Sequence, residues 1–341
     1  MIIRETAPFL SAGVPERNRG RGAGRFAGRL KPPAVLGLGV LFVVLASCSL
    51  NRMVMKKAAD MLSAGGSASA FTEDNDIELV GDALPFAIKM YETLLASNPE
   101  HQGLLLTTGS LFVMYANAYV QGPAETLGPE DYFEKEARLK RAKQLYLRGS
   151  SLLYRALDKK YPGFTEAGDE DIGRYLDRMK KDDVPLLYWT TAGMLSAYSL
   201  DVFDFELGEK IYSLSAMIGR AYELDPDFNI SAIDEFYIIF YSSLPEALGG
   251  NREKALFHFN KALEKTGGHS AGPYVAYAQS FCVPVQDYDG FRENLEKALA
   301  VDENAEPSIR LMNALAKRKA RFLLDNAYIY FSFLPSPYEE W

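Results

Sequence analysis

The side chains that most often act as general bases or metal ligands are sparse in this chain. Its three histidines, His101, His258 and His269, lie far apart and form no pair with the spacing of a helical zinc-binding motif. A metal site or a general base would have to be assembled entirely by the fold. We therefore expect these histidines to lie on the surface or to cap helices, and we expect a non-enzymatic protein without metal or other cofactor.

Acidic residues gather at three places where cations could bind. Residues 74–78 begin like a calcium-binding loop, but Leu79 stands where the turn glycine is required and Pro85 where the bidentate glutamate is required. The runs 169–171 and 182–183 precede helical segments, where carboxylates commonly cap the helix or face the positive end of its dipole. These clusters predict helix starts rather than metal sites.

The two cysteines have different surroundings. Cys282 lies between Phe281 and Val283, which predicts a buried apolar environment rather than a nucleophile. Cys48 follows a basic segment and an apolar run over residues 34–47, the layout of an export signal, and residues 45–48 resemble a bacterial lipobox. We expect a signal peptide over residues 1–47, lipidation of Cys48 and a periplasmic protein anchored to the cell envelope.

Two alternatives to this interpretation of the leader stay open. An ordinary signal peptide could be cut near Cys48 without lipidation, and a start codon placed too far upstream would explain the Gly- and Arg-rich residues 1–25. The leader carries seven basic and two acidic side chains, so the net charge of −8 for the whole chain becomes −13 for residues 48–341. Such an acidic body repels phosphate backbones, which argues against nucleic-acid binding.

Aromatic side chains are the most abundant candidates for ligand binding. The chain contains 20 tyrosines, 20 phenylalanines and 2 tryptophans, many of them in clusters. A tyrosine combines an apolar ring with a polar tip, which suits a groove for a small organic ligand as well as a protein interface. Packing between helices is the alternative at each position. The candidate ligand or pore residues are Tyr188, Trp189, Tyr237, Tyr241, Tyr274 and Tyr277.

The elements that position these side chains are expected to be helices. Apolar residues recur at helical spacing from Asp76 onward, and no convincing alternating strand appears. Pro99, Pro162 and Pro226 each follow an apolar helix end, at intervals of 63 and 64 residues. A Lys-Ala-Leu motif at residues 261–263 recurs after 36 residues, close to the period of tetratricopeptide helix pairs.

These patterns predict an all-α fold of tetratricopeptide-like helical-hairpin repeats in one compact superhelical domain over residues 76–341, preceded by a lipidated tether over residues 48–75. Each of the two long intervals would hold two degenerate units. A non-repetitive helical bundle is the alternative. Helix breaks are expected at Gly122-Pro123, Tyr161-Pro162-Gly163, Val184-Pro185, Gly249-Gly250 and Gly267-Gly268.

Several sequence blocks between residues 76 and 325 together resemble one protein family. These are residues 79–86 with Tyr91, 101–104, 115–118, 121–125, 183–189, 243–250 and 270–275. In these blocks the chain is similar to the T-component (TatT) lipoproteins associated with tripartite ATP-independent periplasmic (TRAP) transporters. The aromatic tail, residues 328–341, has no counterpart in this resemblance.

The resemblance implies a tetratricopeptide-like fold, a lipid anchor and self-association as a homotrimer. It also implies a periplasmic solute-binding protein of the TRAP type as partner, and a pore or cleft that could guide a small organic ligand, including a hydrophobic one. A scaffold for cell-envelope assembly, which would present the same helical surface to protein clients, is the alternative function.

Overall fold

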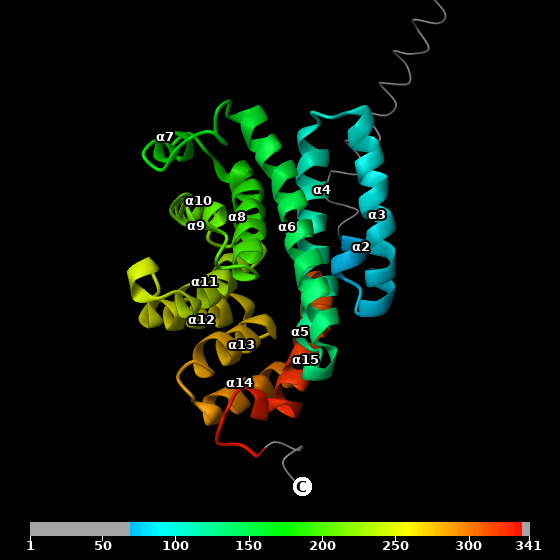
Figure 1. Cartoon of the computed structure of the whole chain (residues 1–341), viewed down its shortest axis with the longest axis vertical. Helices are drawn as coiled ribbons and strands as arrows, with labels where there is room; N and C mark the ends of the chain where they lie inside the picture. The colour runs from blue at the N-terminus through cyan, green and yellow to red at the C-terminus, as the bar shows by residue number, and fades with distance from the viewer. Residues whose placement is uncertain (1–68, 336–341) are drawn as a thin grey trace, which may run out of the picture. The chain divides into compact units, whose positions relative to one another are not determined.

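In the computed structural model, residues 69–335 are described, and all of them belong to one compact unit of the chain, Arg52–Trp341. The predicted signal peptide, Cys48 and most of the predicted tether lie outside the described residues. Every regular element within residues 69–335 is a helix, which confirms the all-α class (Figure 1). The α-helices are α2 (Ser69–Thr72), α3 (Ile77–Ser97), α4 (Gln102–Tyr115), α5 (Gly122–Glu125), α6 (Tyr132–Lys160), α7 (Ile172–Leu176), α8 (Val184–Ser199), α9 (Phe205–Gly208), α10 (Ile211–Leu224), α11 (Ala232–Ser243), α12 (Arg252–Thr266), α13 (Gly272–Tyr277), α14 (Tyr288–Ala300) and α15 (Arg310–Asp325).

Shorter helical turns extend or connect these helices. Two are π-helical and continue an α-helix: η1 (Ala116–Gln121) joins α4 to α5, and η5 (Ala278–Cys282) extends α13. The others are 3-10 turns: η2 (Pro129–Asp131), η3 (Lys181–Asp183), η4 (Glu246–Leu248), η6 (Pro307–Ile309) and η7 (Ala327–Ile329).

Two of the helix starts are fixed by side chains that accept a backbone N–H. Asp76 accepts from the amide of Leu79 at 2.9 Å, so the acidic segment that begins like a calcium loop is the start of α3. His101 caps α4 through Nδ1, which accepts from the amide of Leu104 at 3.1 Å. The prediction of a capping histidine is confirmed at this position.

The two later acidic runs behave differently from each other. Asp183 is buried and accepts from the Lys180 amide at 2.9 Å and from the Tyr161 hydroxyl at 2.7 Å, which holds the turn before α8. Asp171 directly precedes α7, but its side chain pairs with Arg174 and makes no cap hydrogen bond. Capping therefore describes the role of Asp183 better than that of Asp171.

The four long helices α3, α4, α6 and α8 pack against one another in chain order (Figure 1). A Cβ at Gly149 of α6 would lie 2.7 Å from the carbonyl oxygen of Gly109 in α4 and 2.9 Å from the Phe112 Cβ. Only glycine allows the two backbones to come this close. The helix Gln102–Glu125 is long and apolar enough to cross a membrane by length and composition, but it packs against its neighbours as a core helix.

The expected break at Gly122-Pro123 is wrong. Helix α4 runs through η1 into α5, and the amide of Gly122 donates to the Asn117 carbonyl in the wider π-helical register. This register accommodates a proline that would clash with the preceding turn of a regular α-helix. The interval from Pro99 to Pro162 consequently holds two long helices, α4 with η1 and α5, and α6, so the two degenerate units expected there are not confirmed.

The last helix, α15, packs against the first helices of the unit (Figure 1). Arg318 pairs with Glu78 of α3 at 3.0 Å, and Lys319 pairs with Glu125 of α5 at 3.3 Å. Phe71 of α2 packs against the apolar cluster that α15 shares with α3. The end of the predicted tether is thus a helical turn that belongs to the packed domain.

Candidate functional site

The predicted residues Tyr237 and Tyr241 lie one turn apart on α11 and stack with ring centroids 5.1 Å apart. The His258 ring of α12 stacks on both, with centroids 4.5 Å from Tyr237 and 5.7 Å from Tyr241. Tyr222 of α10 meets the histidine ring edge-on at 5.4 Å. Burial raises the pKa of Tyr241, so its hydroxyl stays protonated.

The predicted residues Tyr188 and Trp189 lie on α8 and are half-buried. Their rings meet edge-on with centroids 5.2 Å apart. The Tyr188 ring also contacts the Phe228 ring, with centroids 5.2 Å apart. Burial raises the pKa of Tyr188, and the nearby charge of Glu235 raises it further. The carboxyl group of Glu235 therefore lies close enough to Tyr188 to act on it electrostatically.

The predicted residues Tyr274 and Tyr277 lie on α13 and contact Phe259 of α12, with centroid distances of 6.0 Å and 4.3 Å. Tyr277 also stacks on Phe281 at 4.6 Å. The structure thus places the six predicted residues as three pairs, each with its own aromatic partners. Within residues 69–335 no ring contact joins one pair to another.

A buried ionic network lies beside the α11 pair. Asp234 is fully buried and accepts from His258 Nδ1 at 2.7 Å and from Lys265 Nζ at 2.7 Å. Burial lowers the pKa of Lys265, but the hydrogen bond and charge of Asp234 outweigh it and the net pKa is raised. The expectation of a surface or capping position is wrong for His258, which is buried. The Asp234 carboxylate compensates the burial of its ring. His269 is exposed as expected.

A family model described as "TRAP transporter T-component" matches residues 73–331, which covers the chain from the residues before α3 to the end of η7. The chain belongs to the family of TRAP transporter T-components. An uncharacterized protein of Treponema pallidum (strain Nichols) is 35% identical to it over 298 residues, which cover 82% of this chain and 92% of that relative. Family membership gives the chain a role in TRAP transport as a transport subunit, associated with a TRAP transporter system in the cell envelope.

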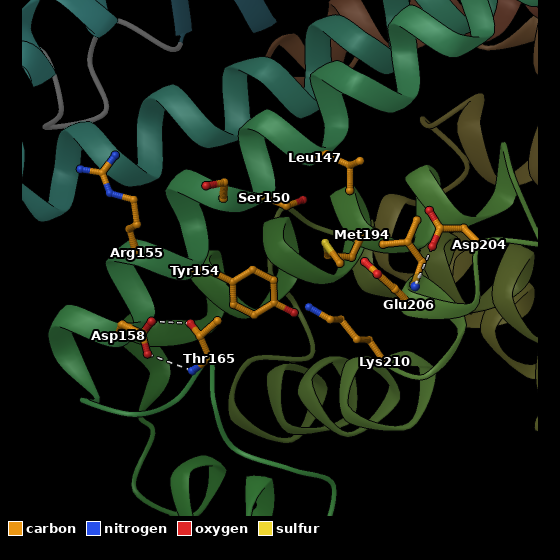
Figure 2. A pocket seen from close by; sticks show the side chains of 12 residues that line it. Leu147, Ser150, Tyr154, Arg155, Asp158, Thr165, Met194, Asp204, Glu206 and Lys210 are labelled. Carbon is orange, nitrogen blue, oxygen red and sulfur yellow. Dashed lines mark hydrogen bonds between the residues drawn. The ribbon is translucent and has the colours of Figure 1, made fainter.

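The T-component also has an open pocket of about 430 Å³ between α6, α8, α9 and α10 (Figure 2). None of the six predicted aromatic residues lines it. Its lining residues are Leu147, Ser150, Ser151, Tyr154, Arg155, Asp158, Thr165, Met194, Asp204, Glu206, Leu207 and Lys210.

Most charged groups of this pocket already have protein partners. Asp158 accepts from the backbone and the hydroxyl of Thr165, and Asp204 accepts from Lys143 at 2.7 Å. The Lys210 ammonium lies 5.5 Å from the Tyr154 ring, and burial raises the pKa of that tyrosine to about 12 (Figure 2). No histidine lines the pocket, so its serines have no such base to activate them as nucleophiles.

A metal site and a reactive cysteine thiol are two further possibilities for chemistry in the described residues. No group of three or more His, Cys, Asp or Glu side chains in the described part of the chain is placed to hold a metal ion. Cys282 is fully buried as predicted, and burial together with the nearby charge of Asp287 raises its thiol pKa to about 12. A thiol in that state is a poor nucleophile.

Sequence reasoning missed the acidic pair Asp234 and Glu235 and the cation Lys265. One signal for the pair was present, since two acids stand side by side in the otherwise apolar run 232–241. Acidic residues inside such an apolar run rarely lie on a solvent-exposed face. They indicate a buried pairing or a functional site. The partners lie 24 and 31 residues away and have no local signature.

Proposed function

We propose that this T-component is a non-enzymatic periplasmic lipoprotein, anchored through lipid on Cys48, that binds the solute-binding protein of a TRAP transporter. The family match over residues 73–331 carries the proposal, because it extends over nearly all of the helical unit. The lipobox-like segment 45–48 supports the anchor, and the acidic charge of the remaining chain is compatible with a partner that is not nucleic acid.

The surface around α9 is the candidate contact for the solute-binding protein. Phe203 and Phe205 each expose 81% of their surface, and Val202 and Tyr212 are exposed beside them in sequence. Large apolar side chains gathered in this way on a folded surface usually mark a protein contact. We name this set of four residues the α9 surface.

The tetratricopeptide-like arrangement is proposed for the second half of the unit. Helices α11 and α12 pack as neighbours, as do α13 and α14, and Ala262 and Ala298 are fully buried on the second helix of each pair. A small residue in this position lets paired helices approach closely. The 36-residue recurrence of the Lys-Ala-Leu motif thus coincides with a recurrence of helix pairs, and stacking of such pairs would generate a superhelix.

Self-association as a homotrimer is proposed through the outer face of α3. Leu79, Phe86 and Met90 are exposed there at spacings of seven and four residues, which places them on one face of the helix. Phe86 exposes 75% of its surface. A contact between copies would cover this apolar stripe.

A ligand role is proposed for the half-buried surface of Tyr188 and Trp189. The half-buried rings and the nearby carboxyl of Glu235 combine apolar surface with a polar group, as small-molecule sites do. The other predicted residues, Tyr237, Tyr241, Tyr274 and Tyr277, would extend an aromatic path if the three pairs line one pore or cleft.

The test is capture of partners from the source cell envelope by residues 49–341, followed by mass spectrometry. A TRAP-type solute-binding protein should be recovered in stoichiometric amount, and the double change Phe203→Ser with Phe205→Ser should abolish its recovery. Phe86→Ser is the matched control, because it removes an equally exposed phenylalanine from α3 and should reduce only self-association in analytical ultracentrifugation.

The alternative function, a scaffold for cell-envelope assembly, makes use of the same exposed α9 surface. It predicts recovery of assembly factors and no solute-binding protein in the same capture. That outcome would reject the proposed partner.

A further inference from the structure

The two adjacent acids of α11 have different electrostatic partners. Asp234 pairs with two potential cations, His258 and Lys265. Glu235 pairs with none of the Lys, Arg or His side chains in residues 69–335. A carboxylate that is removed from water without a counter-charge is a rare and unfavourable arrangement.

In the described part of the chain, only hydroxyl groups donate hydrogen bonds to the Glu235 carboxyl. Ser231 donates to Oε1 at 2.8 Å and Ser270 donates to the same oxygen at 3.4 Å, while Oε2 has no donor among the described residues. Burial raises the pKa of the carboxyl to about 7 despite these two bonds. Glu235 nevertheless keeps part of its surface exposed to solvent.

The backbone leaves room for this carboxyl at the start of α13. A Cβ at Gly272 would overlap Glu235 Oε2, so a glycine is needed for the carboxyl to adopt its position. The free oxygen is therefore held where α11 meets the beginning of α13.

Aromatic rings lie near the Glu235 carboxyl. Tyr188 lies near enough for the charge of Glu235 to raise its pKa, and Phe228 contacts Tyr188 with centroids 5.2 Å apart. Trp189 meets Tyr188 edge-on at 5.2 Å. Aromatic faces attract cations, and this attraction strengthens where water is excluded.

We propose that the partly exposed carboxyl of Glu235, together with the rings of Tyr188 and Phe228, binds the ammonium group of an organic cation. The carboxylate supplies the missing charge, the rings contact the substituents on nitrogen, and the free Oε2 accepts a hydrogen bond where the ammonium carries a proton. An anionic ligand would be repelled by Glu235 and by the net charge of −13 on residues 48–341. This inference names the ligand class for the proposed ligand role and rests on that role.

A bound cation and a proton compete for the same carboxyl. Ligand binding should therefore be stronger at pH 8.5, where Glu235 is ionised, than at pH 5.5, where it is protonated. Binding of the cation should in turn lower the apparent pKa of Glu235.

The probe is benzyltrimethylammonium, titrated calorimetrically into residues 49–341 at constant ionic strength, with benzyl alcohol and benzoate as uncharged and anionic controls. We expect binding of the ammonium probe alone, at least tenfold weaker at pH 5.5 and at least tenfold weaker in Glu235→Gln. Glu170→Gln, which removes an exposed acid, should bind like the wild type. Gly272→Ala keeps the charge but displaces the carboxyl, so it should also weaken binding in a variant whose circular dichroism is unchanged.

Absence of binding by the ammonium probe at pH 8.5, or equal binding by wild type and Glu235→Gln, would overturn the proposal. Equal displacement of the probe by sodium at the same concentration would overturn the organic nature of the ligand. Recovery of the solute-binding protein in the capture experiment would be unaffected by any of these results, so failure of the ligand class is distinguishable from failure of the proposed function.

Discussion

Replacing Glu235 by glutamine should stabilise the protein at alkaline pH and leave its stability at acidic pH almost unchanged. Burial raises the pKa of the carboxyl from its ordinary 4.5 to about 7, against the opposing effect of hydrogen bonds from Ser231 and Ser270. That interval corresponds to about 3 kcal/mol of free energy of unfolding. Because part of the carboxyl surface is open to solvent, this value is the upper end of the expected effect.

The free energy of unfolding falls with rising pH because the folded protein holds this proton more tightly than the unfolded chain does. The contribution of the protonated carboxyl is complete below pH 4.5 and is lost as the pH rises through about 7. Glutamine resembles the protonated carboxyl in shape, still accepts from the serine hydroxyls and has no proton to lose. The variant should therefore lack this loss.

Urea unfolding of residues 49–341, followed by circular dichroism at pH 5 and pH 9, measures the difference. With a denaturant dependence of about 3 kcal/mol/M, the variant's midpoint at pH 9 should be about 1 M higher than that of the wild type, and the two should agree at pH 5. Glu170→Gln, at an exposed position, should follow the wild type at both pH values. Identical pH dependence in wild type and Glu235→Gln would refute the assignment of an uncompensated buried carboxyl.

Three other predictions concern packing and reactivity. Asp234→Asn should lower the free energy of unfolding by about 3 kcal/mol in urea titrations, because the partly buried Lys265 loses its counter-charge, whereas Asp201→Asn at an exposed ion pair should change it by less than about 1 kcal/mol. Gly149→Ala should lower the melting temperature through a cost of about 1–3 kcal/mol at the contact with α4, whereas Gly173→Ala, with nothing within 4 Å, should not. Cys282, the one cysteine of residues 49–341, should react with a disulfide reagent only as fast as the protein unfolds, and labelling within seconds of mixing would contradict its burial.

Helix boundaries could be predicted where the chain itself supplies the stop. Helices α3, α6 and α10 end at Ser97, Lys160 and Leu224, each two residues before the proline used to predict that end. Proline favours an extended residue before it and cannot continue a regular helix, so this information is local. Gly267 likewise ends α12 in a left-handed conformation.

The same local rule failed at Pro123 because packing changed the register of the helix. The π-turn η1 lies in a helix that packs against α6, and the Tyr146 hydroxyl of α6 donates to Gln121 at 2.6 Å. A neighbouring helix that holds the π-turn in place makes a continuous helix compatible with the proline. The sequence near Pro123 contains no record of that contact with a residue 23 positions further along the chain.

The candidate site was predictable in composition but not in partners. The aromatic residues of α8, α11 and α13 are visible as clusters in the sequence, yet their division into three pairs depends on which helices meet. The burial of His258 depends on Asp234, and the role of Asp234 depends on Lys265. Such three-residue networks arise only when α11 and α12 are packed together.

The difference between Asp234 and Glu235 separates what the fold requires from what a function would require. Asp234 joins α11 to α12 through Lys265 and the His258 ring, so stability alone accounts for a carboxylate there. Glu235 pairs with no cation among residues 69–335, its burial is unfavourable when it is ionised, and a neutral side chain would stabilise the fold at this position. Glu235 destabilises the fold when it is ionised, and it lies near aromatic rings and a glycine that leaves space for its carboxyl. Such a combination is typical of a binding site. Since no side chain among residues 69–335 compensates this charge, the proposed ligand would supply the compensating cation.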